Sequence, residues 1–217
     1  SFGGHINDIL KALNVSSQKT IDQSNGIVSN WINQDGLRNQ TIRTFTFIGR
    51  HERRKGIEEL NLALKSLTNS GVKFRFNFIG PIPKSLQIFN QNINYLGEIK
   101  DSEKIKSLLD ESDVLVCPSY AEGMPTVILE AMARGNVIIT TDVGASRKMI
   151  SNNGLLISPS STSIEQAVLK IINNTSDNEL LEMKKVSIEL VSKKFTWENI
   201  IKDQLQKFKE KLALRTC

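Results

Sequence analysis

The sequence is short of the features that mark several large classes of protein. It contains only two cysteines, Cys117 and Cys217, too few for a disulfide framework or a cysteine-based metal cluster. No run approaches the roughly 18 to 20 apolar residues that a membrane span needs, and no signal-peptide pattern opens the chain. We therefore expect a globular protein of a reducing compartment, the cytoplasm, that does not cross a membrane by itself.

Several familiar catalytic motifs are missing too. No GxGxxG or Walker pattern occurs, which counts against dinucleotide-dependent oxidoreductases and P-loop enzymes. No DxD motif suggests a metal site. The only histidines are His5 and His51, and His51 is expected to be a solvated loop residue rather than a catalytic base. The sequence therefore predicts no metal and no resident cofactor.

What the chain does contain is enough apolar material for one core. The 217 residues are 39% hydrophobic and carry a net charge of +5, from 28 Lys and Arg against 23 Asp and Glu. That balance suits a polyanionic ligand, but it equally suits an ordinary solvated surface. Because the chain begins at Ser1 rather than Met, we expect it to be part of something longer.

Short apolar runs alternate with helical patterns along the chain. The runs have the length and composition of strands, and apolar residues recur with helical spacing between them, as in residues 57–67. Since parallel strands need crossover connections, an order of strand, helix, strand, helix throughout predicts an α/β fold with a doubly wound, Rossmann-like parallel sheet of about six strands. The predicted strands are 42–49, 72–80, 93–97, 113–119, 136–140 and 154–158.

The two ends of the chain differ from this middle part. Residues 1–35 are irregular apart from a short helix near 6–13, and we interpret them as a linker from a missing N-terminal domain. Residues 36–195 are the predicted Rossmann-like domain. Residues 196–217 predict a C-terminal helix with Thr196 as its N-cap and an apolar stripe that needs a surface to pack on.

Two carboxylates follow the fourth predicted strand, in YAEGMPTVILEAMARG. Pro125 suits the first turn of a helix that runs from about Met124 to before Gly135, so Glu122 precedes the helix and Glu130 lies in its second turn. Both can reach one ligand beyond the strand ends, where open α/β sheets bind ligands. Glu122 is equally explained as a helix-dipole partner. Glu130 has apolar neighbours and needs donors, for which ligand hydroxyls are good candidates.

Cations follow the first predicted strand, in FIGRHERRKG. Arg50 comes directly after Gly49, and Lys55 precedes the next helix. A planar guanidinium and a compact ammonium near a helix N-terminus suit a diphosphate. Arg53 and Arg54 are expected to be solvated, since their side chains need not face the cleft. Together with the carboxylates, these cations predict a ligand with an anionic part and a polyhydroxyl part, as a nucleotide sugar has.

The ordered motifs of the chain resemble those of the donor-binding C-terminal half of a retaining GT-B glycosyltransferase of family 4, over about residues 20–212. In chain order they are GRHERRKG, LGEI, PSYAEGMPTVILEAMARG, VIITTDVGA, NGLLIS and KFTWENI. The resemblance implies a nucleoside diphosphate sugar as donor, an acceptor in polysaccharide or cell-surface glycan assembly, and a missing N-terminal domain as partner, with no nucleic acid. It implies that the last helix crosses back to that domain, and that the full enzyme can associate with the inner face of the membrane.

The resemblance also implies roles for single residues. Arg50 and Lys55 would bind the diphosphate and stabilise the departing phosphate, Glu122 would contact the transferred sugar, and Glu130 would bind the ribose. Retention in this family is ascribed to same-face attack in which the leaving phosphate accepts the acceptor's proton, so neither a protein nucleophile nor a metal is required. Further donor contacts are implied for Gly49, Ile99, Gly123, Met124 and Thr126.

One motif departs from the family. Many relatives carry a Gly-Gly pair and a nearby Glu after TDVG, whereas this chain has TDVGASRKMI. The donor contacts of residues 144–148 are therefore left open.

Three other functions compete with glycosyl transfer. A glycosidase places two carboxylates on opposite sides of a scissile bond, which a pair on one loop–helix unit beside Arg and Lys suits poorly. A nucleotide-sugar epimerase of GT-B-like fold is closer, but its catalytic acids and histidines are not identifiable here. A non-catalytic basic module for nucleotide or lipid would show steep salt dependence without nucleotide selectivity. We therefore expect a hexosyltransferase that is inactive as this fragment alone.

Overall fold

The computed structural model describes residues 1, 5–33, 37 and 39–213. The expected boundary between linker and domain, at residues 35 and 36, lies outside the described residues, and so does Cys217. None of the helices in the described ranges is long and apolar enough to cross a membrane.

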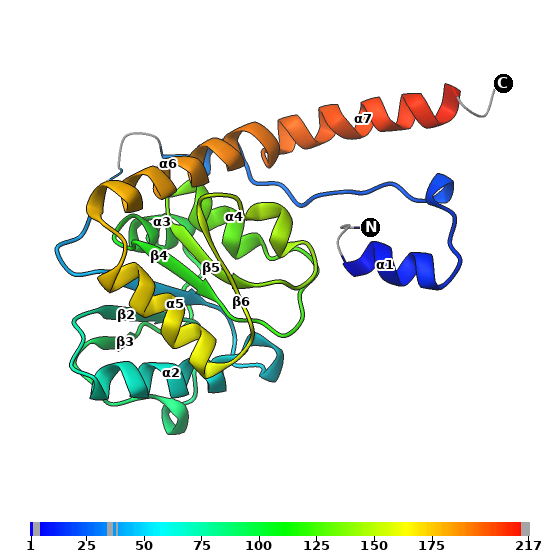
Figure 1. Cartoon of the computed structure of the whole chain (residues 1–217). Coiled ribbons are helices and arrows are strands. Elements are labelled where there is room, and N and C mark those ends of the chain that lie inside the picture. The colour runs from blue at the N-terminus through cyan, green and yellow to red at the C-terminus, as the bar shows by residue number, and fades with distance from the viewer. Residues whose placement is uncertain (2–4, 34–36, 38, 214–217) are drawn as a thin grey trace.

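Six parallel strands form one sheet with the order β3-β2-β1-β4-β5-β6 (Figure 1). Every neighbouring pair runs in parallel, so the predicted doubly wound sheet of about six strands is confirmed. The strands are β1 (Thr44–Ile48), β2 (Arg75–Ile79), β3 (Ile93–Tyr95), β4 (Val114–Cys117), β5 (Val137–Thr141) and β6 (Gly154–Ile157).

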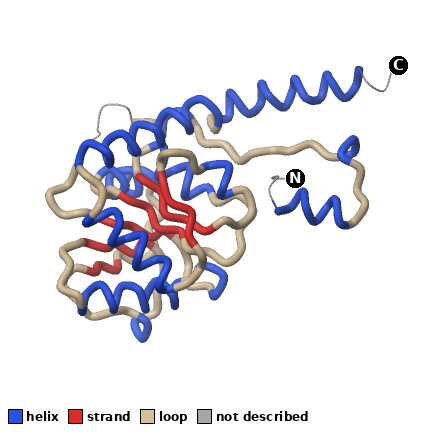
Figure 2. Tube along the Cα trace, in the orientation of Figure 1, coloured by secondary structure: helices blue, strands red, loops and turns tan. Residues whose placement is uncertain are grey.

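Helices cover both faces of this sheet (Figure 2). Apolar residues of α2 and α5 pack in one core cluster with β1 and β2, whereas α4 packs with Leu109 of α3 and Val191 of α6 in a second cluster. Asp101 caps α3 by accepting a hydrogen bond from the Glu103 N–H, and Thr196 accepts one from the Asn199 N–H, as an N-cap does. The helices are α1 (His5–Ala12), α2 (Ile57–Asn69), α3 (Ser102–Asp110), α4 (Thr126–Ala133), α5 (Ser161–Asn173), α6 (Asp177–Lys194) and α7 (Trp197–Ala213).

The two core clusters follow from the period of two along each strand. Phe45 and Phe47 of β1 point into the cluster under α2, while Leu115 of β4 and Ile138 of β5 point into the cluster under α4. Strands buried on both faces are nearly continuous in apolar residues, which explains why these runs are recognisable in the sequence.

The expected strict alternation of strand and helix is wrong at two places. The connection from β2 to β3 contains only a 3₁₀ turn at Lys84–Leu86, and the connection from β5 to β6 contains only one at Ser146–Met149. Pro81 and Pro83 explain the first case, because proline cannot donate in a helix and clashes with the preceding turn. Both short connections lead to the edge strands of the sheet.

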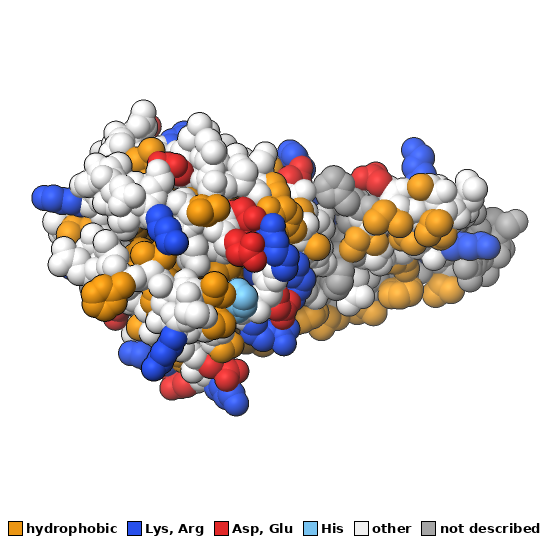
Figure 3. All heavy atoms as spheres, turned by 90° about the horizontal axis from the view of Figure 1, so that it is seen from below, with side chains coloured by type: hydrophobic (Ala, Val, Ile, Leu, Met, Phe, Trp, Pro, Cys, Tyr) orange, Lys and Arg blue, Asp and Glu red, His pale blue; other side chains and the backbone are white. Residues whose placement is uncertain are grey.

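The N-terminal segment and α7 run together away from the sheet (Figure 1). Ile27 accepts a hydrogen bond from the Trp197 N–H and donates its own N–H to Phe195 O, and Gln204 donates to Asp22 O at 2.7 Å. Apolar side chains lie exposed along this projecting part (Figure 3). They include Ile201, Leu205, Phe208 and Leu212 of α7.

A buried ion pair attaches α6 to the sheet. Lys184 Nζ lies 2.6 Å from Asp113 Oδ1, and the two side chains are 3% and 0% exposed. The second oxygen of Asp113 accepts the Thr44 N–H at 2.9 Å. Both β1 and β4 are therefore tied to α6 at their amino-terminal ends, opposite the edge where ligands bind in such sheets.

Replacing Lys184 measures how much this ion pair contributes to the free energy of unfolding. Lys184→Met leaves a buried carboxylate without its cation, so we expect the free energy of unfolding in a urea titration to fall by about 3 to 5 kcal/mol. Lys185→Met is the matched control: Lys185 is 53% exposed and pairs with Glu182 on the surface, so its loss should stay below about 1 kcal/mol. Equal, small losses for both variants would contradict this role of Lys184.

Candidate functional site

The sheet has one point where the strand order changes direction, between β1 and β4. The chain leaves β1 and β4 at the same edge because the two strands are parallel. Ligands in open α/β sheets bind in the crevice at such a switch point. The loop after β1, residues 49–56, and the loop after β4, residues 118–125, flank it, and these are the two loops in which the sequence predicts the site.

These two loops touch through their backbones. Gly56 has a φ of 69°, and a Cβ built on it would lie 2.2 Å from Pro118 O. Glycine is therefore required there for both reasons. The Tyr120 N–H donates to Arg54 O at 2.7 Å. The close approach brings the charged side chains that follow β1 within reach of those that follow β4.

Glu122 is the centre of the charged cluster that results. Lys55 Nζ lies 2.7 Å from Glu122 Oε1, with side chains that are 14% and 8% exposed. Ser119 donates to the same oxygen at 2.8 Å, and Arg54 lies 3.3 Å from the other oxygen. The structure thus brings together Lys55 and Glu122, two of the predicted catalytic residues, in direct contact.

Arg50, the third predicted catalytic residue, lies to one side of this contact. Its side chain is 73% exposed, and its guanidinium lies 2.9 Å from Glu52 Oε1. Arg54 takes the other oxygen of Glu52 at 2.6 Å. The two cations predicted to hold a diphosphate are therefore each paired with a carboxylate, Lys55 with Glu122 and Arg50 with Glu52.

Arg53 reinforces the contact between the loops from the outside. Its guanidinium makes two hydrogen bonds to Glu59, at 2.9 and 2.8 Å, and lies over the Tyr120 ring at 4.6 Å from the centroid. The hydrogen bonds to Glu59 and then to Tyr120 raise the pKa of Arg53 above its already high value. Arg53 thus links α2 to the loop that carries Glu122.

Backbone donors point out of the loop after β4. Among the residues that the structure describes, the N–H groups of Gly123, Met124 and Thr126 have no acceptor. Their carbonyls behave differently: Gly123 O accepts the Ala145 N–H at 2.8 Å, and Met124 O accepts from Asn25 at 2.8 Å. Unpaired N–H groups at a helix start form a binding site for an anion or a hydroxyl group.

The loop after β5 packs directly against this segment. Gly144 has a φ of 56°, and a Cβ on it would lie 2.2 Å from Glu122 O and 2.3 Å from Gly123 O. No side chain fits between the two backbones. The donor contacts left open at residues 144–148 thus begin at a residue that supports the Glu122 loop from behind.

Glu130 lies apart from the charged cluster. It lines a cavity of about 230 Å³ together with Thr126, one turn earlier on α4, and Gly26, Val28 and Trp197 line the same cavity. None of Arg50, Lys55 and Glu122 lines it. The structure shows no hydrogen bond or ion pair to the Glu130 carboxylate from any described residue, and burial raises the pKa of Glu130. The Lys or Arg partner that a core carboxylate would need is therefore not found among the described residues.

The remaining predicted positions lie along the same edge of the sheet. Gly49 follows β1 and donates its N–H to Ile79 O at 2.9 Å. Ile99 is half-buried in the loop between β3 and α3. Gly80 connects these regions by donating its N–H to Gly97 O at 2.7 Å. Backbone hydrogen bonds therefore link the loops after β1, β2 and β3. Ile99 follows β3, however, and so lies two strands away from the switch point.

Two residues of the site escape sequence reasoning. Arg54, expected to be solvated, contacts Glu122, and Ser119, which is fully buried, donates to it. The only signal for Ser119 is its place directly after a buried strand. Within the described ranges, no three His, Cys, Asp or Glu side chains come together in a group that could hold a metal ion.

The parallel sheet, its strand order and the charged switch point together define a Rossmann-like α/β domain. A family model described as Glycosyl transferases group 1 matches residues 42–174. That range is more than half of the chain, and the chain belongs to this family.

Similar proteins agree with this assignment. A putative teichuronic acid biosynthesis glycosyltransferase, TuaC of Bacillus subtilis, is 35% identical over 120 residues, which cover 55% of this chain and 30% of that protein. Sucrose-phosphate synthase from Thermosynechococcus elongatus superimposes with a TM-score of 0.78 and 21% identity, over 96% of this chain and 57% of that one. The C-terminal domain of a group 1 glycosyl transferase (LpcC) from Francisella tularensis gives 0.65 and 23%, over 79% of this chain and 100% of that one.

These matches also show how much of such proteins the chain covers. It spans about a third of TuaC and a little over half of the synthase. The likeness to the two solved structures is a likeness of fold.

The buried carboxylate of Glu130 leads us to expect that stability depends on pH. Because burial raises the pKa of Glu130, the folded protein holds a proton that the unfolded chain releases, so the free energy of unfolding falls as pH rises through and above the ordinary Glu pKa of 4.5. The variant Glu130→Gln has no carboxylate at this position, so its free energy of unfolding does not fall in this way. We expect its melting temperature to exceed that of the unchanged protein at pH 8, with the difference disappearing near pH 4.

The control for this measurement is Glu182→Gln. Glu182 is exposed and pairs with Lys185, so this change should give no gain at pH 8. A melting temperature of Glu130→Gln that is lower than that of the unchanged protein across the whole range would show that Glu130 stabilises the free protein.

Proposed function

We propose that this chain is the donor-binding domain of a retaining glycosyltransferase of family 4, which transfers a hexose-type sugar from a nucleoside diphosphate sugar to a glycan or lipid-linked acceptor. The observation that carries the proposal is the Lys55–Glu122 pair at the sheet's switch point, next to unpaired backbone N–H groups. The likeness to TuaC, whose name places that protein in teichuronic acid biosynthesis, supports a role in polysaccharide or cell-surface glycan assembly.

In this proposal the diphosphate replaces carboxylates as the partner of the site's cations. Lys55 turns from Glu122 and Arg50 from Glu52 toward the phosphates, because a diphosphate offers more charge and more acceptor oxygens than one carboxylate. Glu122 then accepts hydrogen bonds from the sugar. The N–H groups of Gly123, Met124 and Thr126 donate to sugar or phosphate oxygens.

The nucleoside half of the donor extends along the carboxyl edge of the sheet. Glu130 accepts hydrogen bonds from the ribose hydroxyls, which supply the donors that its carboxylate lacks in the free protein. The backbone near Gly49 and Ile99 borders the base and the phosphates. These roles rest on the resemblance of the motifs and on the orphan status of Glu130.

The proposed sugar transfer takes place at the anomeric carbon, with Lys55 and Arg50 beside the departing diphosphate. The bond between the anomeric carbon and the phosphate oxygen breaks, the acceptor oxygen bonds to that carbon from the same face, and the acceptor's proton passes to the leaving phosphate. Lys55 and Arg50 stabilise the negative charge that develops on the diphosphate. No protein nucleophile and no metal takes part in the proposed step, and the chain needs no other cofactor.

The complete enzyme in this proposal has an N-terminal domain that binds the acceptor. Residues 1–35 are then the linker, residues 36–195 the donor domain, and residues 196–217 the helix that returns to the other domain. The exposed apolar side chains of α7 suit such a docking surface. We place the enzyme in the cytoplasm, with peripheral contact to the inner face of the membrane where lipid-linked acceptors lie.

The two cations should be selective for the diphosphate. We expect Lys55→Ala and Arg50→Ala each to weaken binding of a nucleoside diphosphate by about 1.5 to 3 kcal/mol, the range of charge-assisted hydrogen bonds, and to leave binding of the bare nucleoside nearly unchanged. Calorimetric titration with UDP, GDP or ADP, whichever binds best, measures both. Lys65→Ala, an exposed lysine of α2, is the control. Equal losses for diphosphate and nucleoside would contradict the assignment of Arg50 and Lys55.

The chain alone should bind donor without transferring sugar. A ligand at 100 times its dissociation constant adds about 2.7 kcal/mol of stability, which corresponds to a rise of about 5 to 10 °C in melting temperature for a domain of this size. Transfer to an acceptor should be absent in the same preparation. Sugar transfer by these 217 residues alone would overturn the proposal of a separate acceptor domain, and a melting temperature unchanged by any nucleoside diphosphate sugar would overturn the donor site.

A further inference from the structure

The open edge of the sheet carries a groove that the donor site does not use. Its volume is about 670 Å³, within the range of small-molecule sites. Residues of the edge strand β3 line it together with Leu96 and with the loop 84–91 that leads to β3. None of Lys55, Glu122 and Glu130 lines this groove.

The groove is built from a stretch of the chain without charge. Residues 85–97 contain no Asp, Glu, Lys or Arg and five Asn or Gln, although 24% of the whole chain is charged. Among the described residues that line the groove, only Lys84 is charged. One exposed lysine is too little to hold a polyanion, so the groove favours a neutral polar ligand.

Amide side chains supply the polar part of the groove. Gln87 donates through Nε2 to a backbone oxygen at 3.0 Å, and Asn94 donates through Nδ2 to Asn77 Oδ1 at 3.0 Å. These bonds hold both side chains and leave their carbonyl oxygens without a donor among the described residues. Asn90 accepts a backbone N–H at 2.9 Å and keeps its NH₂ group free. The groove therefore offers both acceptors and donors, as hydroxyl groups require.

An exposed aromatic ring supplies the apolar part. Phe89 is 108% exposed, so its ring lies wholly in water. The wall beside it is nevertheless fixed, because Tyr95 stacks on Phe78 with ring centroids 4.7 Å apart and its hydroxyl accepts the Ile88 N–H at 2.9 Å. The ring of Phe89 is thus held next to a preformed groove and is free to pack against a ligand.

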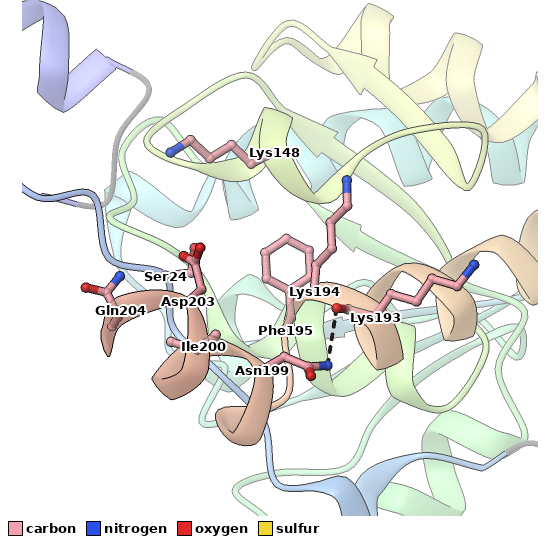
Figure 4. A pocket seen from close by; sticks show the side chains of 9 residues that line it. All are labelled: Ser24, Lys148, Lys193, Lys194, Phe195, Asn199, Ile200, Asp203 and Gln204. Atoms are coloured by element: carbon pink, nitrogen blue, oxygen red, sulfur yellow. Dashed lines mark hydrogen bonds between the residues drawn. The ribbon is translucent and has the colours of Figure 1, made fainter. Parts of the chain in front are cut away.

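A cavity of about 510 Å³ between α6 and α7 differs in this respect (Figure 4). The dashed line in Figure 4 is the hydrogen bond from Asn199 to the carbonyl oxygen of Lys193. Ion pairs within the chain occupy three of the charged groups that line this cavity, namely Lys148 with Asp22, Lys193 with Glu189, and Asp203 with Lys207. Those groups already have partners, whereas the amides at the sheet edge keep free donors and acceptors.

We propose that the groove at β3 binds a neutral oligosaccharide, with one sugar ring packed on Phe89 and hydroxyl groups bonded to Gln87, Gln91 and Asn94. The C–H face of a sugar ring is apolar and packs on an aromatic ring. The hydroxyls of the sugar both donate and accept, as the amides do. The same ligand therefore uses both the apolar and the polar part of the groove.

Two other ligands fit the groove less well. An extended peptide would pair with the open backbone edge of β3, but β3 has only three residues, and so short an edge offers little pairing. An anionic membrane surface would need more cations than Lys84.

The groove lies near the edge of the sheet where the donor is proposed to bind. Leu96 directly precedes Gly97, whose carbonyl oxygen accepts the Gly80 N–H at 2.7 Å. A glycan held in the groove would stay close to the donor site between transfers. This use of the groove rests on the proposed function, whereas the binding itself does not.

Three uncharged tetrasaccharides test the proposal: maltotetraose, cellotetraose and chitotetraose, which differ in linkage or in their N-acetyl groups. Titration followed by backbone amide NMR measures affinity and location together. We expect at least one of them to bind with a dissociation constant of about 1 mM or tighter and to shift the amide signals of residues 84–97. Added NaCl should leave the affinity unchanged, because the ligand carries no charge.

Variants locate the binding. Phe89→Ala should weaken it by about fivefold or more without changing the melting temperature, because the ring is exposed. Leu62→Ala is the matched control, since Leu62 is an apolar side chain of α2 that is 58% exposed and does not line the groove. Lys55→Ala should also bind the oligosaccharide normally, and Phe89→Ala should bind nucleoside diphosphate normally, so the groove and the donor site are tested separately.

Several results would overturn the proposal. It fails if none of the three tetrasaccharides binds at about 10 mM, if Phe89→Ala and Leu62→Ala bind equally well, or if the shifted signals belong to the loop 118–125. Binding to vesicles of an anionic phospholipid that depends on Phe89, with no oligosaccharide bound, would assign the surface to a membrane instead.

Discussion

The contact between Lys55 and Glu122 at 2.7 Å is the interaction on which the site depends. It forms because two parallel strands deliver their loops to the same edge of the sheet and because Gly56 lets the backbones meet at Pro118. The support extends outward from there, through Ser119 and Arg54 on the carboxylate and through Gly144 behind the loop. The charges are thus held in place by backbone packing.

A site built in this way holds its cations ready while the ligand is absent. Buried charges are costly unless they are paired, and here the buried Glu122 pairs with Lys55, while the exposed Arg50 pairs with Glu52. A diphosphate has to displace these carboxylates from the cations, but it meets loops that are already in position. Glu130 is the exception, since its carboxylate has no partner in the described chain, and burial raises its pKa.

The sequence predicts the sheet well because its signals are local. Phe45 and Phe47, for example, belong to an apolar run of strand length, and a strand buried on both faces needs nothing else to be recognised. The expected helix between β2 and β3 fails because Pro81 and Pro83 oppose it. Motif order singles out Glu122 and Lys55, and the structure brings these two side chains into contact. Arg54 and Ser119 are missed because their contacts with Glu122 depend on how the two loops dock.

A crystal structure with a bound nucleoside diphosphate tests the central claim most directly. The quantity to measure is the distance from Lys55 Nζ to the nearest phosphate oxygen. The account predicts a distance of about 3 Å, with Lys55 turned from Glu122 to the phosphate. A diphosphate bound elsewhere, with Lys55 still on Glu122 and the N–H groups of Gly123, Met124 and Thr126 without a ligand, would contradict it.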